Sequence, residues 1–160
     1  MTENVIFHAD TSLGGYAAAA YSKKKRIIEV GIVDLGIGLR ASLGKNPDLP
    51  KPSDDVEAVK KAMTPTITST PERNSGFGLA FTQGLLLANG GSMRVRSGHG
   101  AATIGPDVEY HFRDEHLPGT LVLLRAHADK PLDAGSAWDD LMNGIQRVLR
   151  SHTTDGSTTR

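Results

Sequence analysis

The stretch Arg-Ile-Ile-Glu-Val-Gly-Ile-Val-Asp-Leu-Gly-Ile-Gly, residues 26–38, decides the fold. Residues 26–33 predict a strand, because branched apolar side chains alternate with their neighbours along the chain. One face would carry Ile28, Val30 and Ile32, and the other Ile27 and Val33. A strand that is apolar on both faces belongs in the interior of a sheet. The sequence therefore places Asp34 and a glycine turn at the end of a central strand.

The rest of the chain predicts helices over 53–63, 77–89 and 133–150 and strands over 93–97, 108–112 and 119–126. Residues 16–22 stay ambiguous, because four consecutive alanines favour a helix whereas the short segment lies between two turns. The expected fold is an α+β two-layer sandwich. Its sheet is expected to be mixed, mostly antiparallel, with helices on one face. The expected divisions are a domain over 1–128, a C-terminal helix over 129–150 and a disordered tail over 151–160.

Composition narrows the classes of function. The chain has 160 residues, the size of one domain, and its 18 basic residues balance its 18 acidic ones. A balanced charge argues against nucleic-acid and membrane-surface partners, and the short basic run at 23–26 is typical of a hairpin turn. The chain has no cysteine, which excludes thiol catalysis and disulfides. With no apolar run long enough for a membrane span and no secretory signal, a cytoplasmic location is expected.

Three glycine motifs suggest a ligand. They are Asp34-x-Gly36-x-Gly38, Gly76-x-Gly78-Leu79 and Gly119-Thr120. A carboxylate flanked by glycines can accept a hydrogen bond from an exocyclic amine while a flat ring approaches the backbone. Glycines at the start of a helix expose N–H groups and the positive end of the helix dipole to phosphate oxygens. Taken singly, each motif is more often a plain turn.

A dinucleotide fingerprint is the competing interpretation, because Gly36-x-Gly38-x-x-Ala41 follows a strand and Asp54 or Asp55 lies near the ribose-contact distance. Prolines in the following segment interrupt the helix that the fingerprint requires. No strand precedes the two aspartates to present a carboxylate at its end.

Together and in this order, the three motifs resemble the glycine boxes of the GHKL ATPase superfamily, which includes sensor histidine kinases, type II topoisomerases and certain anti-sigma factors. The resemblance spans roughly residues 4–126. It also covers the segment 89–100, Asn-Gly-Gly-Ser-Met-Arg-Val-Arg-Ser-Gly-His-Gly, which is similar to the family's turn and strand after the second box. The resemblance implies a Bergerat-type fold that binds Mg-ATP, with a long ATP lid over 43–75.

The resemblance also implies roles for individual residues. Asp34 would bind the adenine amine, helped by the Thr120 hydroxyl, and Gly36 and Gly38 would shape the adenine pocket. The phosphates would be held by Gly76, Gly78 and the N–H of Leu79. Lys45 and Arg73 lie in the expected lid and could reach a phosphate, although loop charges are commonly solvated.

The family's upstream N box is matched in part. Asn4 and His8 fit its second half, so Asn4 would bind Mg²⁺ through its amide oxygen. The box's general-base Glu would fall before Met1, which indicates a chain that starts inside the N box. Three functions stay open: a histidine- or serine-kinase module that acts on a phosphoacceptor or regulated protein, a nucleotide-responsive binding module without turnover, and a fragment that binds nothing.

Overall fold

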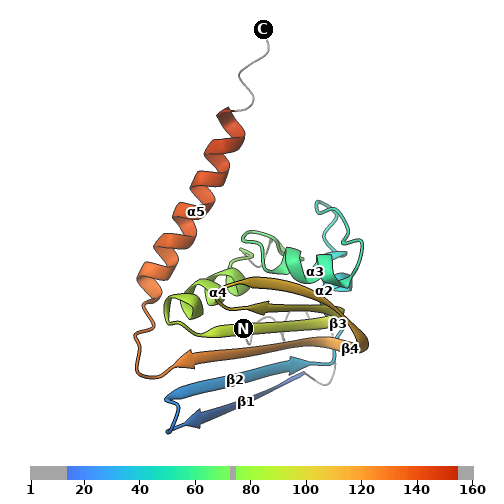
Figure 1. Cartoon of the computed structure of the whole chain (residues 1–160). Coiled ribbons are helices and arrows are strands. Elements are labelled where there is room, and N and C mark those ends of the chain that lie inside the picture. The colour runs from blue at the N-terminus through green and yellow to red at the C-terminus, as the bar shows by residue number, and fades with distance from the viewer. Residues whose placement is uncertain (1–13, 73–74, 155–160) are drawn as a thin grey trace.

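The protein is an α+β sandwich of two layers, one sheet and one layer of helices (Figure 1). The computed structural model describes residues 14–72 and 75–154. Four strands form the sheet in the order β1-β2-β4-β3, and every neighbouring pair is antiparallel. The expected mixed sheet is thus wrong for the part of the chain described, because β4 returns between β2 and β3 and runs antiparallel to both.

The first two strands form a hairpin, β1 (Gly15–Ser22) and β2 (Ile27–Asp34). Their register runs without interruption from Gly15 opposite Asp34 to Ser22 opposite Ile27. The basic residues at 23–26 form the connecting turn, as predicted. The four alanines are therefore a strand, because pairing with β2 outweighs their helix propensity. β2 also pairs with β4, which confirms its predicted interior position.

Strands β3 (Ser92–Ile104) and β4 (Val108–His127) form a long hairpin. The sequence predicts three shorter strands here, over 93–97, 108–112 and 119–126. The structure joins the second and third into β4 and extends the first into β3. The glycines in this region suggest strand ends in the sequence. In the structure the register shifts beside Gly98, and the two strands remain paired on both sides of the shift.

Three described helices follow the expected order: α3 (Asp55–Ala62), α4 (Gly78–Ala88) and α5 (Ala134–Thr154). A fourth, α2 (Gly38–Leu43), lies in the glycine- and proline-rich stretch for which no helix is predicted. The cap of α3 is Asp54, whose carboxylate accepts a hydrogen bond from the N–H of Glu57 at 2.7 Å. Hydrogen bonds from the hydroxyl and N–H of Ser53, with the ammonium of Lys61, lower the pKa of Glu57 from 4.5 to about 2. This reciprocal cap fixes where α3 begins.

The core lies between the sheet and helices α3 and α4. Val59 of α3 is fully buried, and Met93 and Val95 of β3 are almost as inaccessible. Arg94, between the latter two, is exposed on the opposite face, as the alternation predicts. The helices cover β3 and β4 more than β1, whose residues are exposed from Gly15 to Tyr21 (Figure 1).

Helix α5 joins the domain through one aromatic cluster. The ring of Trp138 makes edge contacts with Phe77 and Phe81 at centroid distances of 5.5 and 5.7 Å. The helix then extends away from the sheet to Thr154, four residues into the tail predicted to be disordered (Figure 1). No helix in the described ranges is long and apolar enough to cross a membrane.

The two faces of β3 and β4 give a matched stability test. Met93→Ala should lower the free energy of unfolding by about 2–5 kcal/mol, because it leaves a cavity under the helices. Leu123→Ala, at 41% exposed on the opposite face, should cost less than about 1 kcal/mol. Urea denaturation measures both, and equal losses would contradict the placement of the core.

Candidate functional site

Three strands contribute one polar row to the covered face of the sheet. Asp34 of β2 lies opposite Thr120 of β4, and Thr120 lies opposite Ser97 of β3. Ser97 is two residues beyond the core residue Val95, so the row faces the helices. The predicted first and third glycine boxes are thus adjacent in space.

Of the two carboxylate oxygens of Asp34, one accepts a hydrogen bond from a described residue. Asp34 is 5% exposed, and its Oδ1 accepts a hydrogen bond from the N–H of Gly36 at 2.9 Å. Within the described residues, no group donates a hydrogen bond to Oδ2. A buried carboxylate of this kind retains an acceptor for a ligand N–H group.

Ser97 joins the two boxes, and sequence reasoning missed it. Its hydroxyl accepts a hydrogen bond from the N–H of Leu39 at 2.8 Å and donates one to the carbonyl of Gly119 at 2.7 Å. It therefore holds the start of α2 against β3 and β4. The only signal in the sequence is a Ser-Gly pair at the end of the expected strand 93–97.

Gly38 and Gly119 leave the space that this packing requires. Both have positive φ, 73° and 80°. A Cβ at Gly38 would lie 2.9 Å from the Ser97 hydroxyl, and one at Gly119 would overlap the backbone carbonyl of Asp34. Only glycine combines a positive φ with the absence of a Cβ, so the backbone around Asp34 carries no side chain at these two positions.

The second box opens helix α4. Gly78 is the first helical residue, and a Cβ added there would meet nothing within 4 Å. The preceding residue, Phe77, supplies no side-chain cap, and the first turn holds no acidic residue. The side chain of Leu79 points into the core, which leaves its backbone N–H as the group able to meet a ligand. Among the described residues no side chain caps the first turn of α4, and such a helix start favours an anion.

Gly76 is held by the segment that follows α3. Its carbonyl accepts a hydrogen bond from the N–H of Thr66 at 3.2 Å, which ties the loop before α4 to the segment after α3. No contact within the described residues joins Gly76 or Gly78 to Asp34. The structure brings the first and third boxes together and places the second at a separate helix start.

The expected lid over 43–75 is too broad. Its helix α3 belongs to the core, with Ala58, Val59 and Met63 buried. The segments on either side of α3 are also joined, because the side-chain amide of Asn46 donates a hydrogen bond to the carbonyl of Thr68 at 2.8 Å. The segment is therefore anchored at several points, and Lys45 is exposed on it.

The dinucleotide alternative does not agree with this geometry. Gly38 does open a helix, but α2 has only six residues. Asp54 caps α3, and the Asp55 carboxylate accepts a hydrogen bond from the N–H of His99 at 2.9 Å. Neither carboxylate lies at the end of a parallel strand, where the fingerprint requires it.

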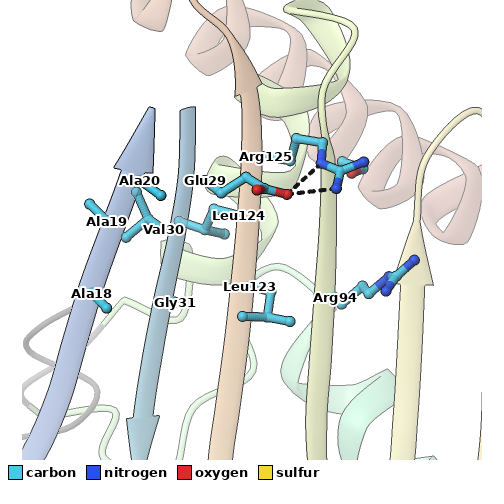
Figure 2. A pocket seen from close by; sticks show the side chains of 11 residues that line it. Ala18, Ala19, Ala20, Glu29, Val30, Gly31, Arg94, Leu123, Leu124 and Arg125 are labelled. Carbon is cyan, nitrogen blue, oxygen red and sulfur yellow. Dashed lines mark hydrogen bonds and ion pairs between the residues drawn. The ribbon is translucent and has the colours of Figure 1, made fainter. Parts of the chain in front are cut away.

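A shallow hollow of about 420 Å³ lies on the opposite face of the sheet (Figure 2). Ala18, Ala20, Gly31 and Leu123 line it. At its rim Arg125 forms an ion pair with Glu29 at 2.6 Å. None of the predicted site residues lines this hollow, so it is separate from the row at Asp34.

Two predicted residues lie outside the described part of the chain: Asn4, the expected Mg²⁺ ligand, and Arg73. No protein-family model matches the chain, and no match was found among curated proteins. The residues around Asp34 and the start of α4 are therefore the features of this chain that bear on its function.

Ser97→Ala should lower the free energy of unfolding by about 1–3 kcal/mol, because it leaves the Leu39 N–H and the Gly119 carbonyl without a partner. Ser92→Ala is the matched control. Ser92 lies on the same strand, half-buried, and its hydroxyl makes no hydrogen bond within the described ranges. Urea denaturation measures the free energy of unfolding of both variants. Similar decreases would show that the two hydrogen bonds of Ser97 do not stabilise the fold more than an ordinary serine on β3 does.

Proposed function

We propose that this chain is a Mg-ATP-binding module of the GHKL type, which acts in signal transduction as part of a histidine-kinase-like or anti-sigma-type protein kinase. The observation that carries the proposal is that Asp34, Gly38, Ser97, Gly119 and Thr120 meet on the covered face where β2 ends. The order of the three boxes along the chain supports it.

The adenine end of the proposed site is built around Asp34. Its Oδ2 is the acceptor for the exocyclic amine, and the half-buried hydroxyl of Thr120 lies on the neighbouring strand. Gly38 and Gly119 fix the backbone beside Asp34, because the space that a Cβ would take at each glycine is filled by the Ser97 hydroxyl or the Asp34 backbone. A ring bound here would be recognised by one charged hydrogen bond and by shape.

The phosphate end is the start of α4. Its uncapped N–H groups and the helix dipole favour an anion, and Gly78 adds no side chain that would hinder phosphate. The proposed ATP lid would be drawn from the segment 43–75 outside helix α3.

Magnesium would neutralise the charge of the phosphates when bound. Asn4 is the proposed protein ligand, on the resemblance alone, because an amide oxygen suits this hard cation. The proposed protein partner is a phosphoacceptor or a regulated factor. Transfer of the γ-phosphate to it would depend mostly on positioning and charge neutralisation.

The first test is calorimetric titration with a non-hydrolysable ATP analogue, with and without Mg²⁺. Asp34→Asn should weaken binding by about 1.5–3 kcal/mol, the range for a hydrogen bond to a charged group. Asp139→Asn, an exposed change on α5, is the control and should leave binding unchanged. Unaltered affinity of Asp34→Asn would remove Asp34 as the adenine acceptor, and a folded wild-type chain without binding would overturn the proposal.

A second variant separates the two ends of the site. Gly78→Val has room in the fold, but its branched side chain would cover the N–H groups at the start of α4. We expect the affinity for ATP to fall at least tenfold, about 1.4 kcal/mol, while the affinity for adenosine stays nearly the same. Titration with both ligands measures this, and an equal loss of both would indicate misfolding or a different phosphate site.

A further inference from the structure

Strand β1 is an edge of the sheet that the described part of the chain leaves without a second partner. It pairs with β2 on one side, and it is the end of the order β1-β2-β4-β3 (Figure 1). All its residues from Gly15 to Tyr21 are exposed, on both faces of the sheet. The backbone N–H and C=O groups along its outer side are a template for another strand.

The two edges of this sheet differ in how they are protected. Strand β3, the opposite edge, carries Arg94 and Arg96, is disturbed by register shifts beside Gly98, and is packed by α3. Such charges and irregularities block edge-to-edge pairing. β1 has none of them: its eight residues, Gly-Tyr-Ala-Ala-Ala-Ala-Tyr-Ser, include no charge and no proline, and its register with β2 is unbroken.

We propose that β1 pairs with β1 of a second copy of this chain, antiparallel, to give a dimer with one continuous eight-stranded sheet. A two-fold axis perpendicular to the sheet generates this contact from one surface, as a closed dimer requires.

The basic turn selects the antiparallel direction. Lys23, Lys24 and Lys25 follow directly after β1. Parallel pairing would place the two lysine turns side by side, whereas antiparallel pairing separates them by the length of the strand, roughly 26 Å at about 3.3 Å per residue. At that distance the repulsion between the turns is screened by salt.

The faces of the sheet restrict the register. Residues that pair across the axis must point to the same face, so the registers that use most of β1 centre on Ala18 or on Ala19. With Ala19 on the axis, the ring of Tyr21, 54% exposed, covers Ala17 of the other copy. In either register Ala19 of one copy lies opposite or diagonal to Ala19 of the other, within reach of a long side chain.

Sedimentation of the full chain across the micromolar range tests the proposal. The mass should rise from 17.0 kDa toward twice that value with concentration. Ala19→Lys and Ala19→Glu should each remain monomeric, because like charges would meet at the axis, and an equimolar mixture of the two should recover the dimer. Gln146→Lys adds the same charge as Ala19→Lys at an exposed position on α5 and should dimerise like the wild type.

Hydrogen exchange of the β1 amides gives a second readout that does not depend on a variant's folding. Protection of residues 15–22 should increase with wild-type concentration. A wild-type chain that stays monomeric, a dimer that survives Ala19→Lys, or protection independent of concentration would each overturn the proposal. The last result would assign the edge to another segment of the same chain.

Discussion

The Ser97 hydroxyl, held between the Leu39 N–H and the Gly119 carbonyl, is the contact on which the candidate site depends. It connects a helix start to the two strands that follow 50 or more residues later. Because the oxygen occupies the space beside Gly38, no side chain can be added there without moving α2. Gly119 is restricted in the same way by the Asp34 backbone. These contacts hold the backbone around the polar row, and no group in the described part of the chain donates a hydrogen bond to Asp34 Oδ2.

The fold was predictable where one physical effect dominates. The alternating apolar side chains of residues 26–33 predict a strand with a neighbour on each side, and β2 does pair with both β1 and β4. Its side chains are nevertheless exposed or half-buried up to Val33, and only Asp34 is buried. The alanines of β1 were ambiguous, because helix propensity is local whereas the hydrogen bonds that decide their state come from β2. Strands β3 and β4 are longer than the sequence predicts. Glycines and a proline suggest breaks locally, but the cross-strand pairing continues through a bulge.

The site was predictable to the extent that its residues are marked by chain position. Asp34 ends β2 and Gly38 begins α2, as the sequence places them, whereas Gly119 and Thr120 lie within the long strand β4, where the register brings Thr120 opposite Asp34. Ser97 was missed because its partner Leu39 is 58 residues away, a distance at which sequence gives no hydrogen-bond geometry. The lid over 43–75 that the resemblance implies is too long, because it includes α3, whose Val59 is buried in the core.

The proposed site and the proposed dimer contact use different strands, and this has a consequence for signalling. The polar row spans β2, β4 and β3, so pairing through β1 leaves Asp34, Thr120 and Ser97 untouched. A two-fold axis normal to the sheet keeps both helix layers on one face and places the two Asp34 rows at opposite ends of the paired strands. Both nucleotide sites would then be open from the same side, and a single partner surface could meet two phosphate donors at once. Dimerisation would change how many donors a partner meets without altering the affinity of either site for ATP.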